Sequence, residues 1–391
     1  MPAIPDWVDL ILRWFHVMAG ISWVGGSLYL LWLARVLDDP DRARRGESGE
    51  PWLVDLGGAL LIEKLGPGAG EQARTHHWFK RETTLTWLSG FILLVAGPLA
   101  GLAIGDDPGA GWRTALLAGA ATLALFGASW VGYDHLWSSR IGARPAVAGG
   151  LSFAILCGIA WMLAAAVPGR VLHIVIGALL GTLMALNVWR HILPGLGEMS
   201  AARREQRRPD EGRCALARTR SIHNSYLMFP VVVLMLGNHF PAWYGHSLNW
   251  LVTTLVVAAF VFARHVVATG GAGKWALFPA LGLFAAATLF VDRDSGREES
   301  AEVGAVPFST VRTIVFQRCQ SCHSSVPSDR RHAASAGGIA FDDPAAIAAL
   351  GVRIRAVTTG SRTMPPPGAA GMTENERELL GRWVAQGAKL E

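Results

Sequence analysis

The stretch "RCQSCHSS", residues 318–325, brings together side chains whose types and spacing suit the binding of a redox cofactor. Cys319, Cys322 and His323 follow the C-x-x-C-H order that marks covalent attachment of a c-type haem. Two cysteines at this spacing reach the two vinyl groups of one haem, and the adjacent histidine is delivered to the iron as its proximal ligand. We therefore predict one covalently bound haem c with His323 as an axial ligand.

The second axial ligand of this haem is expected later in the chain. Met364 in "SRTMPPPG" is the first choice, because the prolines that follow it fix the backbone beside a soft thioether ligand. Met372 is the second choice. Zinc is the alternative for a C-x-x-C pair, but zinc needs about four ligands. No second pair of Cys or His residues follows at zinc-finger spacing, so the sequence favours haem.

The segments on either side of the motif predict a small class I-like cytochrome c domain over residues 309–391. "STVRTIVFQR" is an apolar-periodic helix that runs into the motif, and "MTENERELLGRWVAQGA" is a closing helix. Thr373 is the expected N-cap of that closing helix, with Glu376 three residues on. A chance C-x-x-C-H in a soluble tail would not explain both helices and the Met–Pro turn.

The rest of the chain has the composition of a membrane protein. Hydrophobic residues make up 51% of the chain and charged residues 17%, and of sixteen Trp only Trp383 lies in the tail. A membrane-crossing helix needs about 20 residues. We predict an all-α fold, in which a polytopic membrane helix bundle (1–292) is joined by a linker (293–308) to the cytochrome c domain. About eight spans are expected, at 7–36, 84–104, 112–137, 146–167, 170–194, 222–241, 247–266 and 274–292.

Basic residues predict the orientation of these spans. The loops after odd-numbered spans carry most of the Lys and Arg, including "ARREQRR", whereas the loops after even-numbered spans contribute Arg113 and Arg170. The positive-inside rule then places both termini and the cytochrome domain in the periplasm of a bacterial inner membrane. The N-terminus lacks a basic n-region, so no cleaved signal peptide is expected. Basic inner loops facing anionic lipid explain the net charge of +5, so no nucleic acid partner is expected.

Ten of the twelve histidines lie in the membrane part, where ionisable side chains tend to be functional. They fall at two depths: an outer layer towards the periplasmic side and an inner layer at the cytoplasmic side. His173 and His191 are eighteen residues apart, which is five α-helical turns and about 27 Å of rise. We expect a b-type haem in the outer layer, with His16 as first choice of ligand and His173 or His239 as its partner. The alternative is that interfacial histidines only snorkel and cap helix ends.

Several segments together resemble one protein family. "LRWFHVMAGISWVGGSLY", "HHWFKRETTLTWLSGF", "LHIVIGALLGTLMALNV", "RSIHNSYLMFPVVVLMLGNHFP" and "FARH", followed by a cytochrome c, resemble the bacterial membrane-bound urate oxidases of the PuuD type. The resemblance covers nearly the whole chain. It implies an eight-span domain that oxidises urate, or a related purine, to 5-hydroxyisourate. It also implies that the electrons pass to the fused cytochrome c and the respiratory chain.

The resemblance carries functional residues onto the inner layer. Catalysis or substrate binding is expected of eight positions: His77, Lys80, Glu82, Asn187, His223, Asn224, Arg264 and His265. Lys80, Arg81 and Arg264 would anchor an anion, the two asparagines would hydrogen-bond the ring edge, and Glu82, His77 or His223 would act as base. The alternative for each is a helix-end contact with lipid phosphate.

Two other classes of function compete with the enzyme. A non-catalytic membrane cytochrome that relays electrons from quinol or a separate dehydrogenase would explain the haem motif and the histidine layers equally well. It would not explain "THHWFKRE" in a long inner loop just before a span. A transporter with a cytochrome appendage is the weakest alternative, because the sequence shows no convincing internal repeat. The expected electron acceptor is a downstream cytochrome or a terminal oxidase.

Overall fold

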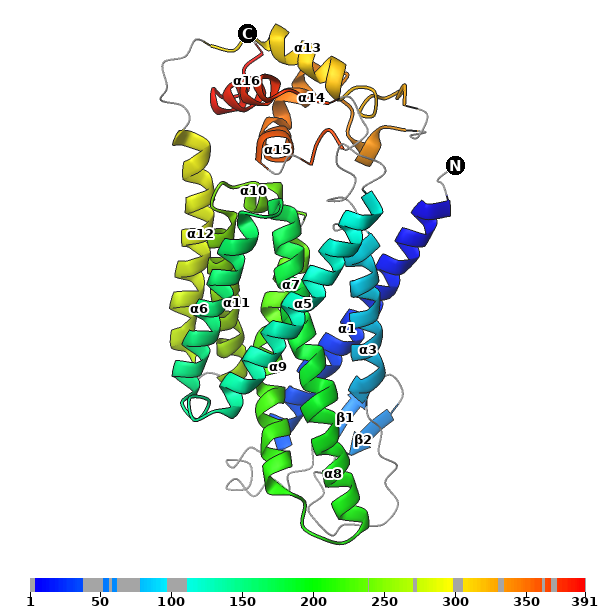
Figure 1. Cartoon of the computed structure of the whole chain (residues 1–391), viewed down its shortest axis with the longest axis vertical. Coiled ribbons are helices and arrows are strands. Elements are labelled where there is room, and N and C mark those ends of the chain that lie inside the picture. Colours follow the sequence, from blue (N-terminus) through cyan, green and yellow to red (C-terminus); the bar gives the residue numbers. More distant parts are fainter. Residues whose placement is uncertain are drawn as a thin grey trace. The chain divides into compact units, whose positions relative to one another are not determined.

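The computed structural model describes residues 4–37, 52–55, 58–61, 78–96, 111–237, 239–269, 273–297, 305–329, 334–360, 363–366 and 371–390, and Figure 1 follows them along the chain. The chain divides into two compact units, and both are discontinuous in sequence. The first unit combines Met1–Asp9, Phe91–Leu180 and Phe229–Glu391, whereas the second combines Leu10–Gly90 and Gly181–Met228. The helices Ile4–Leu37, Trp78–Leu94, Gly169–Asn187 and Glu211–Gly237 each contribute residues to both units.

The second unit is built mainly from α1 (Ile4–Leu37), α3 (Trp78–Leu94) and the part of a long broken helix that follows Leu180. That broken helix comprises α7 (Gly169–Asn187), a π-helical turn η2 (Val188–Ile192) and α8 (Leu193–Arg204). The first half of α9 (Glu211–Gly237) completes the unit. Helix α1 exposes large apolar side chains such as Trp7, Trp14 and Ile21, as expected of a helix that faces lipid.

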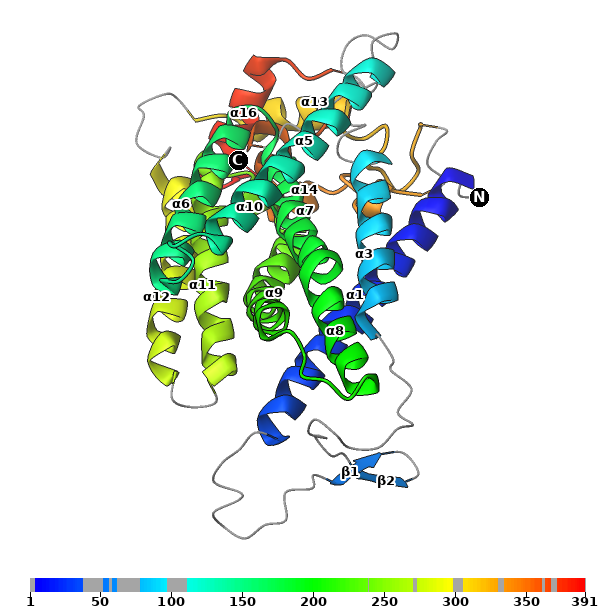
Figure 2. The same ribbon diagram turned by 60° about the horizontal axis from the view of Figure 1, so that its bottom comes forward.

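A small β-hairpin modifies the all-α expectation. Strand β1 (Trp52–Asp55) pairs antiparallel with β2 (Gly58–Leu61), with Trp52 opposite Leu61 and Asp55 opposite Gly58. In Figure 2 the two strands are labelled β1 and β2, and in the sequence they lie between α1 and α3. Trp and Val are residues that favour strands, and this short run is too brief to form a stable helix. Our sequence interpretation treated the whole segment as a loop.

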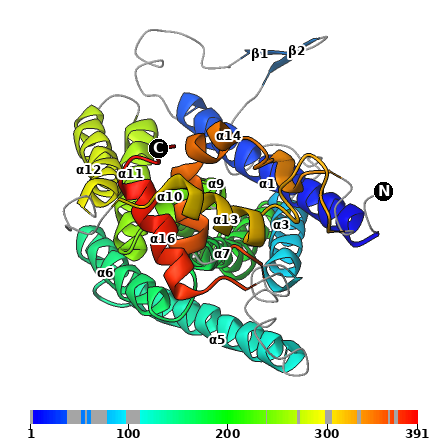
Figure 3. The same ribbon diagram turned by 90° about the horizontal axis from the view of Figure 1, so that it is seen from above.

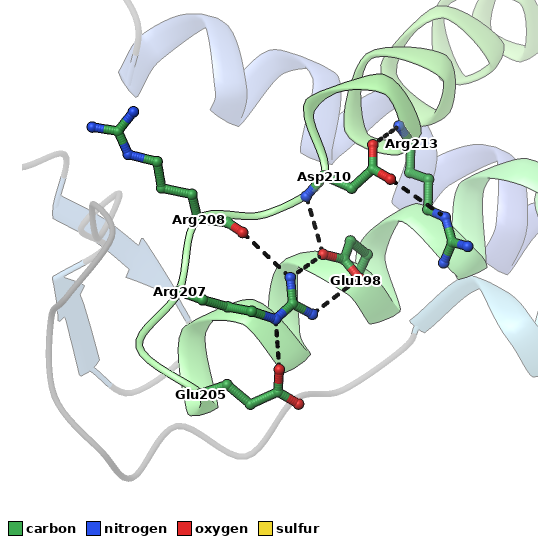
Figure 4. A network of polar contacts seen from close by, with 6 residues as sticks. All are labelled: Glu198, Glu205, Arg207, Arg208, Asp210 and Arg213. Atoms are coloured by element: carbon green, nitrogen blue, oxygen red, sulfur yellow. Dashed lines mark hydrogen bonds and ion pairs between the residues drawn. The ribbon is translucent and has the colours of Figure 1, made fainter.

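Helices α8 and α9 lie side by side and are joined by a polar clasp (Figures 1 and 4). The Arg207 guanidinium donates to both carboxylate oxygens of Glu198, at 2.5 and 3.2 Å, and to Glu205 at 2.6 Å. Glu198 also accepts the backbone N–H of Asp210 at 3.0 Å, and Asp210 in turn accepts that of Arg213. The two carboxylates raise the pKa of Arg207 above its usual range. This clasp closes the turn that leads into α9.

The first unit contains α5 (Gly111–Ser138), α6 (Pro145–Ala164), α11 (Asn249–Thr269) and α12 (Leu277–Arg297). Helix α11 packs between α6 and α12, as Figures 1 and 2 show. Val252, Val256 and Ala287 are buried at the α11–α12 contact. Short turns precede the last two helices: α10 (Pro241–Tyr244) leads towards α11, and η3 (Lys274–Ala276) leads into α12.

Six helices among the described residues are long and apolar enough to cross a membrane. They cover Trp7–Leu33, Leu116–Ser138, Pro145–Ala164, Gly169–Ala202, Asn249–Thr269 and Lys274–Val291. A helix overlaps each of the eight predicted spans, but α3 and α9 are not both long enough and apolar enough to be counted among the six. Helix α3 is described over only 17 residues, and α9 begins with a polar, Arg-rich half. Helix α12 continues to Arg297 and so enters the predicted linker.

The C-terminal residues carry a hydrophobic cluster of their own. Figure 3 shows α13 (Phe308–Arg318), α14 (Pro344–Ala349) and α16 (Glu374–Ala385) gathered together, with α15 (Gly351–Arg355) completing the helices of this segment. Val311, Leu380 and Trp383 are among the most buried side chains of the cluster. The predicted helices before and after the haem motif are confirmed. So is the capping box, in which Thr373 and Glu376 satisfy each other's backbone N–H groups.

Candidate functional sites

The C-x-x-C-H motif begins where α13 ends. Cys319 is the C-cap of α13, and the N–H groups of Cys322 and His323 both donate to the Cys319 carbonyl, at 3.2 and 2.8 Å. His323 Nδ1 lies 3.2 Å from the carbonyl oxygen of Ile339. Because a carbonyl oxygen only accepts hydrogen bonds, Nδ1 carries the proton and Nε2 keeps its lone pair. This is the arrangement that a metal-ligating histidine adopts.

The two cysteines of the motif are free thiols in separate surroundings. Cys319 packs against the C-terminal hydrophobic cluster, and burial raises the pKa of its thiol to about 12. Cys322 Sγ lies 3.5 Å from Asp329 Oδ2. A zinc site would need thiolates and further ligands, and no group of three metal-binding side chains occurs in the part of the chain that the structure describes. Thioether formation instead adds a thiol across a vinyl group, which suits a protonated Cys319.

The segment after the motif folds back over it through backbone and side-chain hydrogen bonds. The N–H of Phe341 donates to the His323 carbonyl at 2.8 Å, and Gln320 Nε2 donates to the Phe341 carbonyl at 2.9 Å. Asp342 accepts from the Ser324 hydroxyl at 2.7 Å and from the Ser325 N–H at 2.6 Å. These hydrogen bonds, with that from Ser324 contributing most, lower the pKa of Asp342. The motif is therefore held at both ends.

The two methionines considered as sixth ligand differ in their surroundings. Met372 is 9% exposed and belongs to the hydrophobic cluster, where its side chain already packs among apolar neighbours. Met364 is 37% exposed. Its backbone is held from both sides, because its N–H donates to the Val357 carbonyl at 2.9 Å and Arg377 Nη1 donates to its own carbonyl at 3.0 Å. An anchored backbone with an accessible thioether favours Met364, and the residues present fit haem c.

The second unit contains an unusual number of buried polar side chains for a group of apolar helices. Asn187 on α7 and Asn224 on α9 are joined by a hydrogen bond from Nδ2 to Oδ1 of 2.8 Å. Asn224 Nδ2 also donates to the Met184 carbonyl at 2.9 Å, which fixes the orientation of its amide. Thr83, Arg220 and Ser225 are buried as well. Polar groups inside membrane helices are costly and mark functional positions.

Glu82 and Thr83 supply polar atoms to this unit from α3. Glu82 Oε2 and Thr83 Oγ1 are buried and make no hydrogen bond with any residue that the structure describes. Leaving a buried polar atom without a hydrogen-bond partner costs about 1–3 kcal/mol. A ligand that donates N–H groups would remove this cost. We call Glu82, Thr83, Asn187, Arg220, His223, Asn224 and Ser225 the inner polar set.

A π-helical turn lies beside the inner polar set. Turn η2 begins directly after Asn187, and such single-turn insertions occur frequently at functional sites. Trp189 of this turn meets Trp87 of α3 edge to face, with ring centroids 5.6 Å apart, and Trp87 Nε1 donates to Thr182 Oγ1 at 3.0 Å. The extra residue also changes the helix register. His191 lies inside η2, so the α-helical spacing assumed between His173 and His191 does not continue unbroken to His191.

His16 joins α1 to α3 in the second unit. Its Nδ1 lies 3.0 Å from the Thr86 carbonyl oxygen and 3.0 Å from Ser89 Oγ. The carbonyl fixes the proton on Nδ1, so Nε2 keeps its lone pair, as at His323. Gly90 leaves room for the ring, because a Cβ there would lie only 2.7 Å from His16 Cε1. His16 is therefore prepared as a ligand through Nε2.

His173 occupies a buried site in the first unit. Only 1% of the side chain is exposed, and Nδ1 donates to the Gly169 carbonyl at 3.1 Å. Its Nε2 lies 3.3 Å from Thr253 Oγ1 on α11. The ring also meets Tyr244 of α10, with centroids 6.5 Å apart at 70°. The proton placement is the same as at His16, but the Nε2 of His173 is already occupied by Thr253 in the structure.

The remaining predicted residues fall in different places. His77 lies outside the described residues, Lys80 is exposed and His223 is half-buried on α9. Arg264 and His265 lie on α11, in the first unit, so the structure divides the predicted inner layer between its two units. Buried Arg264 lies 6.0 Å from the Phe229 ring centre, and His265 meets Trp275. His239 is exposed on the turn after α9.

Sequence reasoning missed buried residues of these sites, among them Arg220, Thr83 and Tyr244. Arg220 was counted with the basic inner loop, although its spacing of three and four residues from His223 and Asn224 places all three on one face of α9. Thr83 has no chemistry that singles it out in a sequence. Tyr244 stands in a turn, and its contact with His173 depends on tertiary structure. Only Arg220 therefore carried a usable signal.

Comparison with known protein families gives one match. The model described as "Urate oxidase N-terminal" matches residues 2–291, most of the chain. The matched range includes both the inner polar set and the sites around His16 and His173, and it ends before the C-x-x-C-H motif. Comparisons with curated proteins and with solved structures give no match. The chain belongs to the urate oxidase N-terminal family.

Proposed function

We propose that this protein is a membrane-bound oxidoreductase that converts urate, or a closely related purine, to 5-hydroxyisourate at the inner polar set. The observation that carries the proposal is the burial of amide, carboxylate and guanidinium groups in one unit of a chain that belongs to this family. Asn187, Asn224, Arg220 and Glu82 offer both donors and acceptors. A urate anion has N–H groups and carbonyl oxygens around its rim, so it can pair with both.

The reaction is a two-electron oxidation with water as the source of oxygen. Urate and one water give 5-hydroxyisourate, two protons and two electrons. Glu82 would take a proton, because its Oε2 is buried, has no donor among the described residues and is free to accept one. Arg220 would stabilise the negative charge of the substrate. The hydrogen-bonded pair Asn187 and Asn224 would set the orientation of the ring edge.

The electrons would leave through the C-terminal domain. A haem c bound by Cys319, Cys322, His323 and Met364 would supply a one-electron acceptor, so each turnover requires two successive transfers. A non-covalent haem b with His16 as a ligand would carry electrons from the substrate to this acceptor. The other partners in this proposal are the lipid bilayer and a downstream cytochrome or terminal oxidase. The basic inner loops support an inner membrane location with the C-terminal domain in the periplasm.

Anaerobic addition of urate to the purified full chain tests the proposal. The expected result is reduction of the c-type haem, with 5-hydroxyisourate formed at one molecule for every two electrons. A Glu82→Gln variant should still bind urate but reduce the haem about 10²–10⁴-fold more slowly, with its pH profile altered, because a general base contributes that factor. Thr84→Ala, an exposed change on the same helix, is the control.

Two outcomes would reject the enzyme. If quinol reduces the haem and urate does not, the protein is a relay cytochrome. If Glu82→Gln retains the full rate and pH profile, the inner polar set is not the site of proton removal.

A further inference from the structure

A close backbone approach occurs within the first unit between the turn at α10 and the C-terminal segment. Helix α10 lies against α15 and against η6 (Ala356–Gly360), a π-helical turn that follows α15. A Cβ atom on Gly360 would collide with the carbonyl oxygen of Gly245, and it would lie 3.0 Å from the Gly245 Cα. A glycine at position 360 therefore allows the two backbones to meet.

The membrane side of this contact rests on His173. Tyr244 precedes Gly245 and is buried, with its ring against the His173 ring. The Tyr244 carbonyl accepts from Asn249 Nδ2 at 3.4 Å and leaves no room for a side chain on Gly169. Gly169 is also the residue whose carbonyl fixes the proton of His173. The turn that meets the C-terminal segment is thus built directly on the candidate haem ligand.

The C-terminal side of the contact leads to Met364. Gly360 ends η6 and precedes Met364 by four residues. The Met364 N–H donates to Val357, and Arg377 Nη1 donates both to the Met364 carbonyl and to the Thr358 carbonyl. One guanidinium therefore holds η6 and the Met364 backbone together. A displacement of Gly360 would therefore also displace the Met364 backbone.

Charge supports the same contact. Burial raises the pKa of the Tyr244 phenol, while the positive charges of Arg170 and Arg353 act in the opposite direction. Arg353 belongs to α15, so a guanidinium of the C-terminal segment lies within electrostatic range of the α10 turn. Arg170 comes from the start of α7. The phenol oxygen of Tyr244 thus experiences charges from both sides of the contact.

We infer that the Tyr244–Gly245 turn is the docking platform for η6, and that this contact positions the Met364 segment next to the part of the membrane helices that holds His173. The purpose of the contact rests on the proposed function, since docking would shorten the path of single electrons into the C-terminal domain. Docking itself makes and breaks no covalent bond. Tyr244, Gly245 and Gly360 are positioning residues in this inference.

Glycine substitutions with a matched control test the contact. Gly360→Val would place a side chain against the Gly245 backbone, whereas Gly371→Val, in the same segment, meets open space. Hydrogen–deuterium exchange on the full chain is the first readout. Gly360→Val should speed exchange at the Trp243 and Tyr244 amides, and Gly371→Val should leave it unchanged. Equal protection in the two variants would overturn the inference. If Gly360→Val abolishes the c-type spectrum, Gly245→Val applies the same test from the membrane side.

Reduction kinetics separate this inference from the proposed function. Dithionite should reduce the haem equally in both variants, whereas reduction from the membrane side should slow several-fold in Gly360→Val alone. If exchange changes as expected but urate reduces neither variant nor the unmodified chain, the docking contact stands and the proposed substrate fails. If urate reduces the haem in all three proteins at one rate and exchange is unchanged, the substrate stands and the docking contact fails.

Discussion

Asn187 donates its side-chain amide to the side-chain carbonyl of Asn224 across 2.8 Å, and this hydrogen bond joins α7 to α9 inside the second unit. Both side chains are buried, and the side-chain amide of Asn224 donates to the backbone carbonyl of Met184. The pair is thus oriented before any ligand arrives. Its energetic importance can be measured, because each partner can be replaced by an apolar side chain of similar size.

Asn224→Leu should lower the free energy of unfolding by about 1–3 kcal/mol, because it leaves the buried Asn187 amide without its acceptor. The double variant Asn187→Leu/Asn224→Leu should be less destabilised than the sum of the two single variants, since no polar partner is then stranded. Thermal unfolding in detergent measures both. Thr219→Ala, exposed on the same helix, is the control. Strict additivity of the two losses would contradict the coupling.

Gly90→Ala should destabilise the second unit by about 1–3 kcal/mol, because the new methyl group forces the His16 ring to move. The same change should alter the b-type haem spectrum if His16 is a ligand. Gly25→Ala on α1 is the matched control, since a Cβ there meets nothing within 4 Å. Thermal unfolding and the optical spectrum are the measurements. Loss of stability without any spectral change would remove His16 from the ligand set.

Met364→Ala should change the low-spin spectrum of the haem c and lower its reduction potential, because thioether ligation favours the reduced iron. Met372→Leu should leave the spectrum unchanged and cost less than about 1.5 kcal/mol, as a volume-conserving change in a hydrophobic cluster does. Spectroelectrochemistry on the full chain compares the two. A spectral change in Met372→Leu alone would assign the sixth ligand to Met372.

Asp342 should give the loop after the haem motif a specific pH dependence. Its pKa is lowered in the folded protein by hydrogen bonds from Ser324 and Ser325. A lowered pKa means that stabilisation is fully present above the unfolded value of about 3.9 and is lost as pH falls through the folded value. Amide exchange at Ser325 should therefore be protected at neutral pH and lose that protection in acid. Asp342→Asn should show weaker protection at neutral pH and no such transition.

The sequence could predict the helices because apolar runs and caps are local signals. Six helices among the described residues are long and apolar enough to be predicted spans, and the capping box at Thr373 and Glu376 forms as expected. The β1–β2 hairpin was missed, because the alternating strand pattern of eight residues in a polar loop is weak. Turn η2 was missed for another reason. One inserted residue leaves no compositional mark, yet it rotates everything after Asn187 relative to the preceding helix.

The candidate sites could be predicted only where the functional residues are consecutive in the sequence. Cys319, Cys322 and His323 form a contiguous motif, so their setting could be anticipated. The hydrogen bond from Asn187 to Asn224 joins positions 37 residues apart, and the contact between His173 and Tyr244 links separate elements. Such pairs depend on how helices pack, which residue type alone does not specify. The division of the inner-layer residues between two units could not be predicted for the same reason.

The discontinuity of the two units constrains the order in which a ribosome can complete them. The second unit needs both Leu10–Gly90 and Gly181–Met228, so α1 and α3 must wait for about a hundred intervening residues before their partners on α7 and α9 emerge. During that wait, Trp87 is without Thr182 and Trp189, its partners in the finished protein. The first unit is completed later, because it includes Phe229–Glu391, which follows the last segment of the second unit. During membrane insertion, α1 and α3 therefore remain without their packing partners until α7 and α9 have been synthesised.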